Sequence, residues 1–192
     1  MLKIAILGAE CTGKTTLLAD MVSQLRAQGA RVSVVDEVLR QWCAAQGRTP
    51  RADEQAAIMH AQIAAVEAAA GCDYLLCDTT PLVTAVYSEL LFDDHSLYPV
   101  AVAQQRRYQL TLLAGTDLPW QADGIQRDGP AARDQVDRRL CEVLQIYALP
   151  LYPVCGLGAA RLACATAALA QFHASGNHAD SSPADADVGA PA

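Results

Sequence analysis

The feature that most constrains this chain is the stretch GAECTGKT, residues 8–15, which directly follows an apolar run. Gly8 and Gly13 are five positions apart and are followed by Lys14 and Thr15, so the spacing is G-x-x-x-x-G-K-T. Glycines at these positions let the backbone turn tightly, so that successive N–H groups point at one anion. Apolar residues then recur at helical spacing over 17–25. The order of strand, glycine-rich turn and helix predicts a phosphate-binding loop.

The side chains of this loop have expected roles toward a nucleotide and its metal. Lys14 supplies positive charge to the β- and γ-phosphates, and Thr15 offers its hydroxyl to Mg²⁺. The following helix adds the positive end of its dipole. ATP and Mg²⁺ are therefore the expected cofactors. The residues expected to contact the nucleotide are Gly8, Glu10, Cys11, Thr12, Gly13, Lys14, Thr15 and Thr16.

Strand and helix patterns alternate along the rest of the chain. Strands are predicted at 2–7, 31–35, 74–77, 108–113 and 149–154, and helices at 17–25, 50–70, 81–91, 99–107, 131–147 and from 159 to about 172. Such alternation predicts a parallel sheet with crossover helices. With the phosphate loop, it indicates an α/β P-loop NTPase with a doubly wound five-stranded parallel sheet, helices on both faces and a lid loop. One domain is expected over 1–172, and a disordered tail over 173–192, where apolar residues are almost absent.

Polar side chains follow two of these strands, where ligands bind in open α/β sheets. Asp36 and Glu37 follow the second strand, and either carboxylate could accept a proton from a substrate hydroxyl. Arg40 could hold a polar group of the same substrate. Asp78 ends the buried third strand in the Walker B pattern and is predicted to serve the metal. The alternative for these acids is helix capping.

The long polar loop at about 116–130 is predicted to be a lid. Within it, Arg127 could neutralise charge on a transferring phosphoryl group. Asp123, from the same loop, is a further candidate for substrate binding. Three aromatic side chains could stack on a planar substrate, with core packing as the alternative: Trp42, Tyr87 and Trp120.

Composition and charge exclude several classes of protein. The net charge of −7 and the pI near 4.9 argue against nucleic-acid binding, which needs a basic face. No apolar run is long enough to cross a membrane, and no signal peptide precedes the first strand. The seven cysteines form no C-x-x-C pair, which is typical of free thiols in the cytoplasm. A guanine-specific N/T-K-x-D motif is missing. The oligomeric state stays open.

Four segments resemble the NadR-like ribosylnicotinamide kinase domains of the AAA-type P-loop kinase group: GAECTGKTTL, VVDEVLRQW, LLCDTTPLVTAVYSELLF and LLAGTDLPWQADGIQRDG. The resemblance covers about 2–155 and implies ATP-dependent phosphorylation of the 5′-hydroxyl of nicotinamide riboside, giving nicotinamide mononucleotide for NAD synthesis. It implies that ATP phosphates and Mg²⁺ are held by Gly8, Gly13, Lys14, Thr15 and Thr16. It also places Asp36 or Glu37 at the substrate ribose, Asp78 at the metal and Arg127 in the lid. The second strand end departs from the family's aromatic-A-R-E pattern.

The sequence therefore predicts a kinase domain alone, acting on a nucleoside-like small molecule, with nicotinamide riboside as the first choice. One alternative is a kinase for another nucleoside or small metabolite. A second is a regulatory P-loop ATPase that hydrolyses ATP to change its affinity for a protein partner. Acceptor dependence separates these classes, because a switch hydrolyses ATP without an acceptor.

Overall fold

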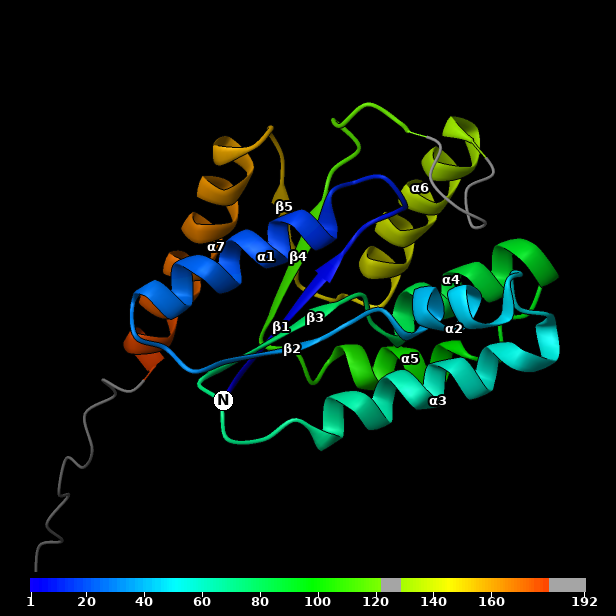
Figure 1. Cartoon of the computed structure of the whole chain (residues 1–192), viewed down its shortest axis with the longest axis horizontal. Coiled ribbons are helices and arrows are strands. Elements are labelled where there is room, and N and C mark those ends of the chain that lie inside the picture. Colours follow the sequence, from blue (N-terminus) through cyan, green and yellow to red (C-terminus); the bar gives the residue numbers. More distant parts are fainter. Residues whose placement is uncertain (122–128, 180–192) are drawn as a thin grey trace, which may run out of the picture.

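The structure is a computed structural model that describes residues 1–121 and 129–179, with side chains up to residue 175. In this part of the chain, five strands form one parallel sheet in the order β2-β3-β1-β4-β5 (Figure 1). The strands are β1 (Leu2–Leu7), β2 (Val32–Val35), β3 (Tyr74–Asp78), β4 (Leu110–Ala114) and β5 (Tyr152–Val154). This order puts the Walker B strand β3 directly beside β1, which leads into the phosphate loop. The predicted fold class is confirmed.

Helices cover both faces of the sheet (Figure 1). One face is covered by α1 (Lys14–Ala27) and α7 (Ala159–Ala179). The other side holds α2 (Val38–Gln46), α3 (Ala52–Ala68), α4 (Pro81–Phe92), α5 (Tyr98–Gln105) and α6 (Pro130–Ile146). No helix in the described ranges combines the length and apolar character that a membrane span requires.

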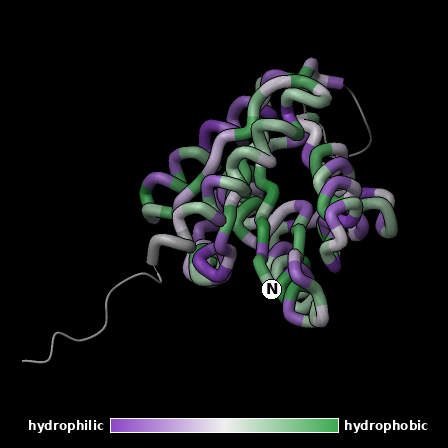
Figure 2. Tube along the Cα trace, turned by 90° about the vertical axis from the view of Figure 1, so that its left-hand side faces the viewer, coloured by the Kyte–Doolittle hydropathy of each residue, from purple (hydrophilic) through white to green (hydrophobic). Residues whose placement is uncertain are grey.

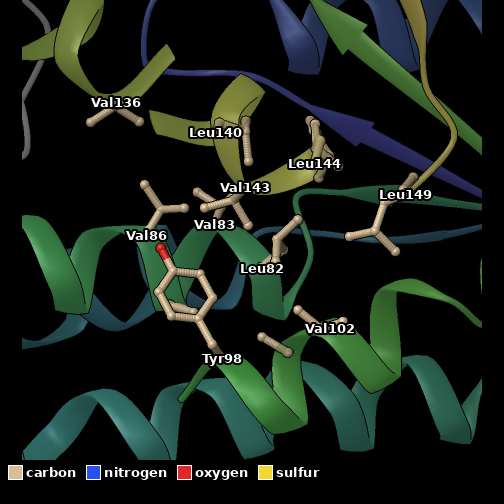
Figure 3. Packing of buried hydrophobic residues seen from close by; sticks show 14 of the residues in the cluster. Leu82, Val83, Val86, Tyr98, Val102, Val136, Leu140, Val143, Leu144 and Leu149 are labelled. Atoms are coloured by element: carbon tan, nitrogen blue, oxygen red, sulfur yellow. The ribbon is translucent and has the colours of Figure 1, made fainter. Parts of the chain in front are cut away.

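The central strand β1 contributes to the core on both of its faces. Ile4 and Ile6 pack toward α1 and α7, whereas Ala5 and Leu7 pack toward α4, α5 and α6, and all four are fully buried. Figure 3 shows the second of these clusters, where side chains of α4, α5 and α6 meet. Along the tube in Figure 2 the strands are accordingly apolar and lie between helices of mixed hydropathy. Burial on both faces explains why β1 reads as a continuous apolar run.

Most element boundaries differ from the sequence prediction by one to three residues, and three differences concern a whole element or its end. The short helix α2 was not predicted, although Gly47, with φ 65°, ends it as a helix-terminating glycine would. Strand β5 begins at Tyr152 rather than at 149, and Ala148 precedes it with a positive φ of 49°. Helix α7 continues to Ala179, past the boundary expected at 172. The rest of the predicted tail, 180–192, lies outside the described residues.

None of the seven cysteines forms a disulfide bond in the structure. Burial raises the pKa of Cys77 to about 11, and burial also raises the pKa of Cys141. These two thiols therefore stay protonated at neutral pH, which makes them poor nucleophiles. They serve as small apolar side chains of the core.

The corner between α2 and α3 is built around one carboxylate. Both oxygens of Glu54 accept hydrogen bonds from Arg48, at 2.7 and 2.8 Å, and the backbone N–H of Arg51 donates to Glu54 at 2.8 Å. The Arg48 guanidinium also lies over the Trp42 ring, 4.8 Å from its centroid. The hydrogen bond from Arg48 is the main reason that the pKa of Glu54 falls to about 2.

We expect the Glu54 contacts to weaken in acid. A carboxyl whose pKa is lower in the folded protein stabilises it above the ordinary glutamate pKa, and this contribution is lost as the pH falls toward 2. Glu54→Gln should therefore lower the free energy of unfolding at pH 7 and flatten its decrease between pH 6 and pH 3, as urea denaturation would measure. Asp53→Asn, whose side chain is 76% exposed, is the matched control and should keep the wild-type profile. Parallel pH profiles for Glu54→Gln and wild type would contradict this role.

Candidate active site

The phosphate-binding loop needs glycine at two positions for steric reasons. Gly8 has φ 148°, and a Cβ there would lie 2.8 Å from the carbonyl oxygen of Ala114. Gly13 has φ 72°, and a Cβ there would lie 2.6 Å from a methyl group of Leu118. At Gly8 the contact is with the backbone, so a side chain there would displace it. At Gly13 the Leu118 side chain would have to move, and the positive φ would strain any residue other than glycine. The loop thereby fits closely against the residues that follow β4.

A buried arginine in α7 binds the back of this loop. Arg161 is 4% exposed and donates to the carbonyl oxygens of Thr12 at 2.6 Å and Gly115 at 2.8 Å. It also donates to the carbonyl of Gly156 at 2.8 Å and to Asp117 Oδ1 at 2.7 Å. Burial alone would raise the pKa of Asp117, but the hydrogen bonds from Arg161 and Gly156 outweigh it and lower that pKa. Arg161 thus ties the loop to the ends of β4 and β5. No sequence motif marks this residue.

Replacing Arg161 by leucine should destabilise the protein by about 3–5 kcal/mol, because it leaves a carboxylate and three carbonyls without their donor. Arg31→Leu is the matched control. Arg31 also lies 2.7 Å from a carboxylate, that of Asp73, but the two side chains are 71% and 44% exposed. Its loss should destabilise the protein far less than the loss of Arg161, because solvent screens an exposed ion pair. Urea denaturation measures both values, and equal losses would show that Arg161 has no special role.

Lys14, Thr15 and Asp78 meet at the mouth of the loop. Lys14 is 7% exposed and its Nζ donates to the Ala9 carbonyl at 2.7 Å. Burial lowers the pKa of Lys14, while the charges of Glu37 and Asp78 oppose that shift. The Thr15 hydroxyl donates to Asp78 Oδ2 at 2.7 Å, and the buried Asp78 Oδ1 accepts no hydrogen bond from any described residue. The predicted Walker B aspartate therefore lies against the predicted magnesium ligand of the loop.

The two acids that follow β2 lie in different surroundings. The Glu37 side chain is 11% exposed, and its Oε2 lies 3.2 Å from Arg40 Nη2. Arg40 also donates to the Thr15 hydroxyl at 3.3 Å, so Glu37 and Arg40 both lie beside the phosphate loop. Asp36 is exposed, and its backbone carbonyl accepts from the Gln62 amide at 3.3 Å. Gln62 also accepts from the backbone N–H of Val38 at 2.9 Å, so this buried amide of α3 fixes the backbone on both sides of Glu37.

Two cavities meet at this point. The larger, of about 510 Å³, is lined by Lys14, Glu37 and Arg40 at its polar end and by side chains of α2, the start of α3, α4 and α6 elsewhere. The smaller, of about 320 Å³, is lined by Cys11, Gly13, Lys14, Thr15, Thr16, Arg40, Leu118, Pro119 and Gln121. Lys14 and Arg40 line both cavities. The arrangement can hold two molecules with a cationic boundary between them.

The three aromatic candidates lie in different places. Tyr87 lines the larger cavity, and its hydroxyl donates to Glu10 Oε2 at 2.8 Å. Trp42 packs beside the buried cluster around Leu39 and beneath Arg48, and it lines neither cavity. Trp120 is half-buried and also lines neither of them. Neither tryptophan therefore lies where it could stack on a ligand in these two cavities. Trp42 packs instead against the apolar cluster around Leu39.

The predicted lid is described only at its ends. Arg133, in the first turns of α6, donates to the Leu118 carbonyl at 2.9 Å, and Asp117 is bound to Arg161. The start of the loop is therefore attached both to α6 and to the back of the phosphate loop. Arg127 and Asp123, the predicted lid arginine and substrate ligand, lie outside the described residues.

A protein-family model described as an AAA domain matches residues 3–161, so the chain belongs to this family of P-loop proteins. A sequence comparison with curated proteins gives no match.

Several solved structures share the fold. NadR protein in complex with NR superposes with a TM-score of 0.72 at 20% identity, covering 89% of this chain and 50% of that one. NadR protein in complex with NAD and AMP-PNP gives 0.72 at 20% identity, with coverages of 90% and 49%. Deoxyadenosine kinase from M. mycoides with bound dATP gives 0.57 at 15% identity, with coverages of 88% and 100%. The chain thus spans about half the length of the NadR chains it matches.

Proposed function

We propose that this protein is an ATP-dependent kinase of a small nucleoside-like molecule. The observation that carries the proposal is the pair of cavities that share Lys14 and Arg40. The smaller cavity contains the phosphate loop and would receive ATP, and the larger cavity would receive the acceptor. A phosphoryl group crossing from one to the other would pass the positive charges at their boundary. Positioning of this kind, together with electrostatic stabilisation, accounts for most catalysis in phosphoryl transfer.

The residues at the mouth of the loop fit a magnesium ion. Mg²⁺ prefers oxygen ligands and keeps several of its waters. Thr15 supplies a hydroxyl and Asp78 a carboxylate, whose buried Oδ1 accepts no hydrogen bond from the described residues and so needs a partner. When bound, the ion would neutralise phosphate charge. Thr15 and Asp78 are the residues that would hold it, directly or through its waters.

Glu37 is the best placed general base for the acceptor hydroxyl. It lines the larger cavity together with Lys14, and Gln62 fixes the backbone on both sides of it. Glu37 would accept the proton of the attacking hydroxyl, while Arg40 holds its carboxylate in place and Lys14 stabilises charge on the transferred group. Asp36 is exposed and lines neither cavity, so we assign it no catalytic role. Arg127 keeps its proposed role as a lid residue.

Nicotinamide riboside is the acceptor we propose, with the 5′-hydroxyl as the site of phosphorylation and nicotinamide mononucleotide as the product. The resemblance of the sequence motifs to NadR-like kinase domains supports this choice, and a solved NadR structure of the same fold holds NR. The larger cavity has room for a nucleoside and combines a charged end with apolar walls, as ligand sites commonly do.

The test is the release of ADP from Mg·ATP with and without acceptors. A kinase should release ADP only when an acceptor is present, and nicotinamide riboside should be preferred over adenosine, cytidine and uridine. Preference for another nucleoside or metabolite would keep the kinase and replace its substrate. Equal ADP release without any acceptor would instead indicate the regulatory P-loop ATPase.

A further inference from the structure

Two buried side chains that line the larger cavity have a polar atom without a hydrogen-bond partner among the described residues: Thr79, next to Asp78, and Gln55. Gln55, in the first turns of α3, is 1% exposed, yet its Oε1 accepts no hydrogen bond from the described residues. It lines the larger cavity together with Leu39, Cys43 and Val83. Buried amides in folded proteins are almost always hydrogen-bonded. An amide that lines a cavity and has no partner is therefore placed to bind whatever occupies that cavity.

The same helix provides a direct comparison. Gln62 lies two turns farther along α3 and is also buried, at 3% exposure. Its carbonyl oxygen and its NH₂ group both bind backbone atoms that flank Glu37. A buried glutamine on α3 can therefore have hydrogen-bond partners for both its carbonyl oxygen and its NH₂ group, as Gln62 does. The carbonyl oxygen of Gln55 has no such partner among the described residues. Because leaving a buried acceptor unpaired is unfavourable, a ligand that supplies the donor gains affinity there.

The position of Gln55 fits the base of a nucleoside rather than its reacting hydroxyl. Lys14, in the phosphate loop, and Glu37, after β2, line one part of the cavity wall. Gln55 lines the cavity from α3. Helix α3 begins beyond the end of α2, on the side of the molecule away from β1 (Figure 1). The side chains that line the cavity from α2, α4 and α6 are mostly apolar, which suits a planar ring. No charged residue of α3 lines the cavity.

We propose that Gln55 selects acceptors whose base carries an N–H donor, such as a carboxamide, over those that carry a carboxylate. This inference rests on the proposed function, because it takes the larger cavity as the acceptor site. Oε1 would accept from the N–H of the carboxamide. A carboxylate in the same place has no proton to donate and would face Oε1 with negative charge. The discrimination follows from leaving a polar group of the site unpaired, which is an effective way to reject an analogue.

The experiment compares nicotinamide riboside with nicotinic acid riboside, which differ only in amide and acid. Dissociation constants are measured by calorimetry without nucleotide, and kcat and KM are measured with Mg·ATP. Wild type should bind the amide at least about tenfold more tightly than the acid. Gln55→Leu should reduce that ratio to about twofold or less and raise KM for the amide more than it lowers kcat. Its Tm should be equal to or above that of wild type, because an unpaired buried amide is removed.

Two variants serve as controls. Gln41→Leu changes an exposed glutamine that lines neither cavity and should keep the wild-type preference. Gln62→Leu should lower Tm, because it removes two hydrogen bonds that are present. A Gln55→Leu protein that keeps the full amide preference overturns the inference. A Gln55→Leu protein that loses affinity for both ribosides equally, and whose Tm falls, also overturns the inference, because that result indicates a structural role.

The outcomes also separate this inference from the proposed function. Amide-selective binding that depends on Gln55, without phosphorylation of either riboside, would support the inference and overturn the kinase. Phosphorylation of both ribosides at equal KM would support the kinase and overturn the role of Gln55. If neither riboside binds, the role of Gln55 and nicotinamide riboside as the acceptor are both overturned, whereas the kinase itself stands or falls with ADP release in the presence of the other nucleosides.

Discussion

Replacing Lys14 by alanine is expected to reduce kcat for phosphoryl transfer by about 10²–10³-fold or more. Lys14 is the positive charge that lines both cavities from within the phosphate loop, and its burial removes the solvent that would otherwise weaken its field. Alanine keeps the helix and the glycine turns but removes the charge. ADP release at saturating Mg·ATP and acceptor measures the effect, and the Tm of the variant shows that it is folded.

The chain offers a matched control for this experiment. Lys3 is its other lysine and stands near the start of β1, at the opposite end of the strand from the phosphate loop. Lys3→Ala should therefore leave kcat within about twofold of wild type, as expected for a substitution far from the reacting groups. Wild-type turnover by the Lys14→Ala protein would show that this loop does not carry the reaction.

The second large effect is expected at Glu37. Glu37→Gln keeps the size of the side chain and its capacity to accept from Arg40, but removes its ability to take a proton. General-base catalysis typically contributes about 10²–10⁴-fold, so kcat should fall by that factor while KM for ATP changes little. Initial rates over a range of acceptor and ATP concentrations separate these two constants.

Asp36→Asn is the control for Glu37, because the two acids are neighbours in the chain and only one lines the cavity. We expect Asp36→Asn to retain at least about half of the wild-type kcat, as for a surface substitution away from buried groups. A large loss in Asp36→Asn together with little loss in Glu37→Gln would reverse the assignment. Losses of equal size in both would indicate that the turn after β2 matters as a whole rather than through one carboxylate.

Local sequence patterns were sufficient to predict the central strands and the phosphate loop. The strand before Gly8, the glycine spacing and the helix after Lys14 are all encoded within one short stretch, and the structure has them in that order. Asp78 could be placed for a similar reason. The Walker B pattern, a buried strand that ends in an acid, is also local to one stretch of sequence. The pairing of β3 with β1, which brings this acid beside the phosphate loop, is seen only in the structure.

The residues that local patterns missed depend on contacts between distant segments. Arg161 binds the carbonyl of Thr12, 149 positions away, and nothing around Arg161 marks that contact. The choice between Asp36 and Glu37 could not be made from the sequence, because it depends on which of the two side chains the turn between β2 and α2 directs toward the cavity. The unpaired amide of Gln55 could be recognised only once the cavity around it was known. The packing of Trp42 could not be predicted for the same reason, because the cluster beside it includes Ile58 from α3.

The central claim is that the γ-phosphoryl group of ATP is transferred to a hydroxyl in the larger cavity. The most direct test is to incubate the wild-type protein with γ-³²P-labelled ATP, Mg²⁺ and nicotinamide riboside, and to separate the products. Label should appear in nicotinamide mononucleotide in a one-to-one ratio with ADP, and the 5′-deoxy analogue, which lacks the hydroxyl, should receive none. Label found only in inorganic phosphate, at the same rate with either compound, would contradict it.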